Sequence, residues 1–162
     1  MELASSQRGA RWPAAESWRD GHAAVRQELR VAVDRGCYFH AFADGNGVPL
    51  NGSANNYVLT FQLGQQPDVQ RFWSLTAYVP VTIELGTHSG GKYVVASYTT
   101  HLVTAPDGSV SVVMAVKKPA GVPKANWLPI PNGPFSLMLR AYGPNWNQQT
   151  NPYTPPPIQV LP

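Results

Sequence analysis

Eight short apolar runs, each bounded by turn residues, occupy the chain from Cys37 to Leu161. The runs are CYFHAF, NYVLTFQL, FWSLTAYV, TIEL, KYVVASYTTHLV, SVSVVMAV, FSLMLRAY and IQVL, and segments such as DGNG, GQQPD, THSGG, PDGS and PNGP separate them. Short runs rich in β-branched and aromatic residues, with turns between them, are typical of two-layered all-β folds. The pattern predicts an antiparallel β-sandwich of jelly-roll type over residues 38–162.

Size and composition agree with this fold class. A chain of 162 residues forms one domain and buries roughly 70% of its unfolded surface, so it needs no metal or disulfide to fold. The 14 glycines and 16 prolines suit many turns, and charged residues make up only 13% of the chain.

The first 37 residues have a different residue pattern from the rest of the chain. No proline occurs between Ala14 and Arg35, and the apolar or aromatic residues Trp18, His22, Val25 and Leu29 recur at helical spacing. We therefore expect an N-terminal extension, 1–37, that holds one amphipathic helix over about 14–35. Its apolar side should pack on the sandwich or on a neighbouring subunit.

The stretch ANWLPIPNGPFSLMLRAYGP, residues 125–144, combines prolines, a possible turn and an apolar run. Prolines fix φ and remove hydrogen-bond donors, so residues 128–134 are predicted to be a rigid connector, with positive φ at Asn132–Gly133. FSLMLRAY should be a central strand. Arg140, its single charge, is expected to reach a carboxylate or carbonyl at the sheet edge.

Several classes of function are disfavoured by what the chain lacks. Its net charge is only +3, and the arginines of its first 35 residues alternate with acids, so no continuous basic surface for nucleic acid is expected. The single cysteine, Cys37, excludes an internal disulfide and is expected to be a buried thiol. No signal-peptide core and no run of 18 apolar residues is present, which predicts a soluble chain of undecided compartment.

Candidates for catalysis are few. Asp44 and Asp107 lie in D-G turns, where a carboxylate usually caps its own backbone, so a pair of catalytic carboxylates is hard to assemble. A metal site of the cupin kind would need His40, His88 or His101 with Glu84 on one inner face, and the candidates for it are His88, His101 and Glu84. We expect no catalytic residue, no metal and no cofactor.

One uncharged segment, YGPNWNQQTNPY, residues 142–153, combines aromatic and amide side chains that could bind a ligand. Flat aromatic rings beside amides, which both donate and accept hydrogen bonds, are suited to sugar rings and other neutral polar ligands. The candidate ligand-binding residues are Tyr142, Asn145, Trp146, Asn147, Gln149 and Tyr153. The alternative is a polar loop whose aromatic rings pack against the edge of the sandwich, and Trp73 and Trp127 are expected in or beside the core.

Six blocks in a fixed order also carry a family resemblance. They are DGNGVPLNGS, YVLTF, FWSLTAY, PDGSVSV, the stretch 125–144 quoted above, and YTPPPIQ. Together they resemble the family called domain of unknown function 1214, over roughly residues 38–161. In that family the domain usually follows a second one, domain of unknown function 1254, and both are jelly-roll-like sandwiches. The resemblance implies the same sandwich and no particular reaction.

This chain departs from the family in two respects. The N-terminal partner domain is absent from the sequence, so the resemblance implies a homo-oligomer or a partner chain that supplies this domain. Where the family often reads PLDG, this chain reads PLNG, so Asn51 replaces a carboxylate.

For function we favour a non-catalytic binding or assembly module that takes a neutral polar ligand such as a saccharide. Two alternatives stay open: an enzyme with a cupin-like or polysaccharide-acting site at the mouth of the sandwich, and a structural shell or filament subunit.

Overall fold

The computed structural model describes residues 25–28, 36–79, 92–147 and 150–162. Its strands, in chain order, are β1 (Val25–Glu28), β2 (Gly36–Ala41), β3 (Asn56–Phe61), β4 (Val69–Tyr78), β5 (Val94–Ala96), β6 (Val110–Ala115), β7 (Trp127–Pro129), β8 (Ser136–Pro144) and β9 (Ile158–Leu161). One short 3-10 turn, η2 (Lys124–Asn126), precedes β7.

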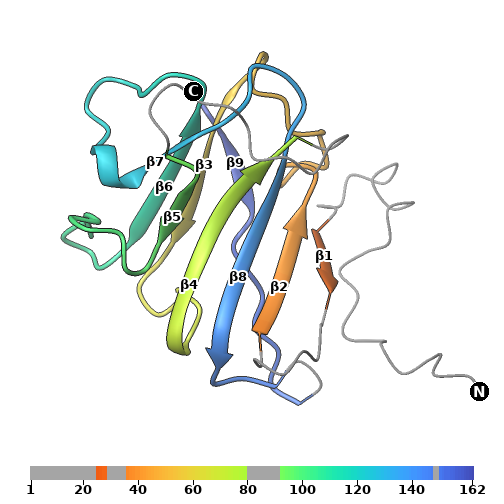
Figure 1. Ribbon diagram of the computed structural model, residues 1–162, viewed down its shortest axis with the longest axis vertical. Coiled ribbons are helices and arrows are strands. Elements are labelled where there is room, and N and C mark those ends of the chain that lie inside the picture. Colours follow the sequence, from red (N-terminus) through yellow and green to blue (C-terminus); the bar gives the residue numbers. More distant parts are fainter. Residues whose placement is uncertain (1–24, 29–35, 80–91, 148–149) are drawn as a thin grey trace, which may run out of the picture.

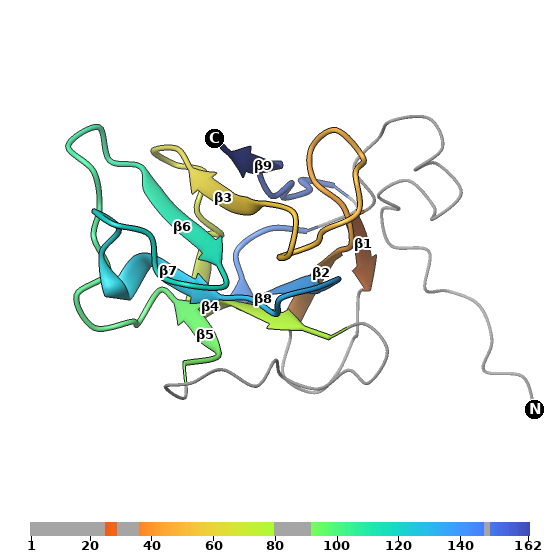
Figure 2. The same ribbon diagram turned by 90° about the horizontal axis from the view of Figure 1, so that it is seen from above.

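The strands form two sheets that pack face to face, as Figures 1 and 2 show from two directions. One sheet has five strands in the order β1-β2-β8-β4-β5, and the other has four in the order β7-β6-β3-β9. The prediction of an all-β sandwich is thus confirmed. β8 lies in the middle of the larger sheet, as its nearly continuous apolar sequence predicted.

One strand pair departs from the expected antiparallel arrangement. β6 and β7 run parallel, with Val113 opposite Trp127 and Ala115 opposite Pro129. Residues 116–126 carry the chain back to the starting end of β6, and a connection of about this length is what parallel neighbours need. All other strand pairs among the described residues are antiparallel.

The core lies between the sheets and follows the two-residue period of the strands. Its inward-facing side chains include Phe39 and Ala41 from β2, Tyr57, Leu59 and Phe61 from β3, Trp73 and Leu75 from β4, Val112 and Met114 from β6, and Leu137, Leu139 and Ala141 from β8. Trp73 packs on Phe61, with 5.1 Å between ring centroids. Trp127 lies at the core edge, where its Nε1 donates to the carbonyl of Ala115 at 3.0 Å. Cys37 is buried, as expected.

The predicted helix over 14–35 is wrong at its centre. Val25–Glu28 is a strand that pairs with β2, Val25 opposite Ala41 and Glu28 opposite Tyr38. The free edge of β2 offers backbone donors and acceptors to this segment, and that long-range pairing outweighs a helical spacing made by a few residues. The other residues of the predicted helix, and the predicted strand TIEL, lie outside the described residues.

The connector after residue 127 also differs from its prediction. Trp127–Pro129 is an edge strand, β7, and Pro129 is tolerated because it ends this strand. Neither Asn132 nor Gly133 has a positive φ. Instead, the backbone N–H of Gly52 donates to the carbonyl of Gly133 at 2.8 Å, so pairing with the distant PLNG segment shapes this connector.

Candidate functional site

The segment that leaves β8 is fixed to a neighbouring loop. The backbone N–H of Asn145 donates to the carbonyl of Asp68 at 2.9 Å, and its Nδ2 donates to the Asp68 carboxylate at 2.8 Å. Asp68 therefore anchors Asn145. The N–H of Asn151 donates to the carbonyl of Asn147 at 2.7 Å, which closes a turn after Trp146.

Trp146 and Tyr153 lie against each other at this end of the sandwich. Their ring centroids are 4.9 Å apart with the planes inclined by 36°, and both side chains are half-buried against the core. Tyr153 also meets Phe39 edge-on, with 5.6 Å between centroids. Its hydroxyl donates to the carbonyl of Gln65 at 2.7 Å. Burial raises the pKa of Tyr153 above the ordinary tyrosine value, so this hydroxyl remains a donor.

The indole N–H of Trp146 is the unusual group of this pair. Its Nε1 is buried and has no hydrogen-bond acceptor within the described part of the chain. Buried donors normally have a partner, and leaving one without costs free energy. Exposed Asn145 and Asn147 stand on either side of it in sequence. We name Asn145, Trp146, Asn147 and Tyr153 the Trp146 site.

Tyr142 lies away from this site, on the opposite face of the larger sheet. It stands beside Phe72, with 4.6 Å between ring centroids, and meets Tyr38 edge-on at 6.1 Å. Partial burial, and then its contact with Tyr38, raise the pKa of Tyr142. The six residues grouped by sequence therefore do not form one surface. Gln149 lies outside the described residues.

Sequence reasoning missed the surface to which Tyr142 belongs. The outer face of the five-stranded sheet carries a group of aromatic side chains with Arg140 among them, which we name the aromatic face: Tyr38, Phe72, Tyr78, Tyr98, Arg140 and Tyr142. The available signal was an aromatic residue at an outward position of each of three strands, Tyr38 in β2, Phe72 in β4 and Tyr142 in β8. It could be used only once the strand pairing was known.

Arg140 has different partners from those expected. Its Nη2 donates to the hydroxyl of Tyr78 at 2.6 Å and its Nη1 to Thr76 Oγ1 at 3.4 Å, and its guanidinium lies 5.4 Å from the centre of the Tyr78 ring. The prediction of a carboxylate or carbonyl at the sheet edge is wrong, because β8 is central and its neighbour β4 brings two hydroxyls to Arg140.

The turn carboxylates act locally, as predicted. Asp44 Oδ1 accepts from the backbone N–H groups of Asn46 at 2.9 Å and Val48 at 3.0 Å. Asp107 Oδ1 accepts from the hydroxyl and the N–H of Ser109, and these bonds lower the pKa of Asp107.

Asn51, which replaces a carboxylate, has the same kind of role. Its Oδ1 accepts from the N–H and the hydroxyl of Ser53, at 2.9 and 2.7 Å. An amide oxygen performs this capping as a carboxylate oxygen would.

The weak metal candidates are not brought together by the described structure. His88 and Glu84 lie outside the described residues, and His101 is exposed in a turn with φ of 63°. Within the described ranges, no three His, Cys, Asp or Glu side chains are grouped so that they could hold a metal ion. The same ranges contain no helix that is long and apolar enough to cross a membrane.

The fold and the contacts define a β-sandwich domain with an aromatic outer face and a Trp–Tyr pair at one end. Residues 35–146, more than half of the chain, match the family described as "Protein of unknown function (DUF1214)", and the chain belongs to this family. The resemblance drawn from the six sequence blocks is thereby confirmed. Among curated proteins, none matches the chain.

Two solved structures are similar. The VPA0106 protein from Vibrio parahaemolyticus is 27% identical, with a TM-score of 0.69 over 78% of this chain and 31% of that one. An uncharacterized protein from Burkholderia cenocepacia shares the fold, at 19% identity and a TM-score of 0.51 over 91% of this chain and 37% of that one. The chain thus spans about a third of the length of these relatives.

Proposed function

We propose that this domain is a non-catalytic binding module that holds a neutral polar ligand, such as a saccharide, at the Trp146 site. The observation that carries the proposal is the buried indole N–H of Trp146, which has no acceptor within the described residues. A ligand hydroxyl or carbonyl oxygen at this position would supply the missing acceptor.

The surroundings of Trp146 support a neutral ligand rather than an ion. The ring of Tyr153 backs the indole, and the only side chains flanking it in sequence are the amides of Asn145 and Asn147. The segment is also held in place before any ligand arrives, because Asp68 anchors Asn145 and Gln65 anchors Tyr153. A site fixed in advance loses less conformational entropy on binding.

The test is calorimetric titration and thermal shift with a panel of neutral oligosaccharides on three proteins. Trp146→Phe keeps a ring against Tyr153 but removes the N–H, and Tyr98→Ala removes an aromatic ring that is 62% exposed on the aromatic face. We expect a ligand that raises the melting temperature of the parent and of Tyr98→Ala, with at least a tenfold loss of affinity in Trp146→Phe. Equal binding by all three proteins, or by none, would refute the assignment.

A second role, in assembly, is supported by the aromatic face. We propose that this face contacts another protein surface, and that a second copy of this chain is the partner. Tyrosine, phenylalanine and arginine are the residues that concentrate in the centres of protein interfaces, and here they share one outer sheet face. The similar solved chains are about two and a half times as long, so they have further chain available to cover the equivalent face.

Light scattering over a range of concentrations tests this role. Tyr98→Arg places a charge on the aromatic face, and Leu63→Arg places the same charge at another residue, which is 77% exposed. We expect the parent and Leu63→Arg to form a defined oligomer and Tyr98→Arg to dissociate. A parent that stays monomeric at high concentration excludes self-association through this face.

We further propose that residues 38–162 form one sandwich of jelly-roll type preceded by an extension, 1–37. The alternation of the chain between the two sheets supports this assignment, because β2, β4 and β8 lie in one sheet while β3, β6 and β9 lie in the other. An experimental structure whose strands followed simple up-and-down neighbours in each sheet would contradict it.

A further inference from the structure

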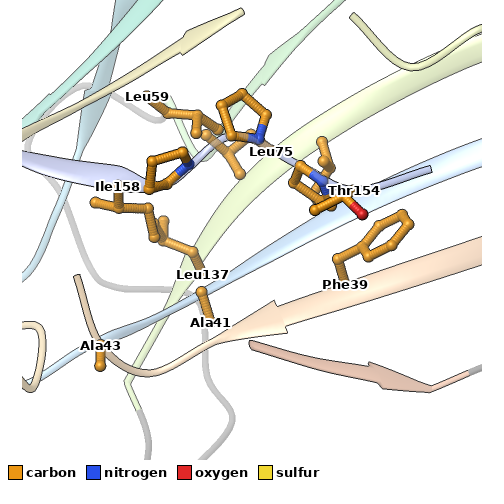
Figure 3. A pocket seen from close by; sticks show the side chains of 12 residues that line it. Phe39, Ala41, Ala43, Leu59, Leu75, Leu137, Thr154 and Ile158 are labelled. Carbon is orange, nitrogen blue, oxygen red and sulfur yellow. The ribbon is translucent and has the colours of Figure 1, made fainter. Parts of the chain in front are cut away.

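A cavity of about 240 Å³ lies between the two sheets. Side chains from both layers line it, as Figure 3 shows, and the segment before β9 closes one side with three consecutive prolines. The lining residues are Phe39, Ala41, Ala43, Leu59, Leu75, Leu137, Leu139, Thr154, Pro155, Pro156, Pro157 and Ile158.

The space is partly open to solvent, and tightly packed layers seldom leave a space of this size between them. An apolar cavity of about 150 Å³ is already enough to bind benzene, and the cavity here exceeds it.

Two features of the sequence keep this space open. Ala41 and Phe39 both face inward from β2. The side chain of Ala41 is small, so it leaves unfilled the volume that a large side chain such as Phe39 would occupy. Pro155, Pro156 and Pro157 have no backbone N–H and a fixed φ, so this segment covers the cavity without joining a sheet ladder. The cavity is therefore covered by the three proline rings and not by a strand of either sheet.

The lining determines what the cavity can hold. Among the described residues that line the cavity, Thr154 has the only polar side chain and none is titratable. Water in such a space would lack the two to four polar partners that it needs, and an ion or a saccharide would lose its hydration without compensation. Thr154 is exposed, so its hydroxyl marks the solvent end of an otherwise apolar space.

We propose that this cavity is a binding site for a small molecule with a hydrocarbon body and one hydroxyl or carbonyl end. The hydrocarbon lies among Leu59, Leu75, Leu137 and Leu139, and the polar end lies at the Thr154 hydroxyl. This site differs from the Trp146 site both in its lining residues and in ligand chemistry, so it goes beyond the function proposed above.

The experiment is a titration of the full chain with octanol, followed by methyl NMR. We expect saturable shifts in the methyl signals of the four lining leucines. The exposed apolar residues Val48, Leu63, Val103 and Val160 provide an internal control, since non-specific adsorption would act on them. Shifts spread over those exposed methyl groups, or no shift at all, would overturn the proposal.

Variants then test the cavity directly. Ala41→Leu fills part of the cavity from β2. Ala43→Val adds a smaller side chain to the cavity from the segment just after β2. Each should weaken octanol binding by tenfold or more, while Trp146→Phe should leave it unchanged. Octanol binding that survives in whichever filling variant folds would show that the ligand lies elsewhere. Because Trp146 does not line the cavity, failure of one proposal is distinguishable from failure of the other.

Discussion

Replacement of Gly52 by alanine should destabilise the domain through a single backbone collision. The Cβ of an alanine here would lie 2.1 Å from the carbonyl oxygen of Pro131 and 3.1 Å from Ile130 Cδ1. The first distance falls about 1.3 Å short of the 3.4 Å at which ordinary contact begins. The obstacle is backbone, so it cannot rotate away as a side chain could.

The cost of Gly52→Ala follows from two effects. Overpacking that shifts backbone costs about 1–3 kcal/mol. Moving the connector also breaks the hydrogen bond from the Gly52 N–H to the carbonyl of Gly133, now 2.8 Å long, at a cost of about 1 kcal/mol. We expect a loss of about 2–4 kcal/mol in the free energy of unfolding, which lowers Tm by roughly 10 °C in a domain of this size.

Gly133→Ala provides the matched control, because Gly133 is the residue that accepts the hydrogen bond. A Cβ there meets nothing within 4 Å, and Gly133 does not have a positive φ. Its substitution should change stability by less than about 0.5 kcal/mol, or raise it slightly by restricting the unfolded chain. Urea denaturation of both variants gives the comparison. If the two alanine variants unfold at the same urea concentration, the steric argument is refuted.

Three further predictions concern single side chains. Asn126→Ala should cost about 2–3 kcal/mol in urea denaturation, because the buried Asn126 side chain both accepts from the Val103 N–H and donates to the Val103 carbonyl, and an unchanged midpoint would contradict this. Burial raises the pKa of Tyr153, so the unfolded chain releases this proton first, from about pH 10, and folding stability should fall above that pH by up to about 1.4 kcal/mol per pH unit. Tyr153→Phe should reduce that slope, measured as unfolding free energy against pH. Cys37 should react with a thiol reagent only after unfolding, and rapid labelling of the folded protein would count against its burial.

The parts of the fold that sequence predicted are those fixed by local chemistry. Trp73, expected in or beside the core, is buried there, since a strand directs every second side chain inward. Asp44 and Asp107 cap their turns because a short side chain can reach only nearby N–H groups. These features need no information about distant segments.

The parts that sequence missed depend on partners far along the chain. Val25–Glu28 is a strand only because β2 lies beside it, and Trp127–Pro129 only because β6 does. The candidate site was divided for a similar reason. Tyr142 is still in β8 and faces outward with Arg140, whereas Trp146 lies beyond the strand and packs toward the core. Closeness in sequence did not predict which face of the sheet each ring would join.

Phe39 contacts both proposed sites, so a ligand bound in the cavity should change the NMR signals of the Trp146 site. Its ring lines the apolar cavity and also meets Tyr153 edge-on, and Tyr153 backs Trp146. Octanol in the cavity should shift the Phe39 ring and thereby the NMR signal of the Trp146 indole N–H. Ala41→Leu, which fills the cavity, should abolish the octanol response. An indole signal that stays fixed while the lining leucine methyl groups respond would show that the two sites are independent.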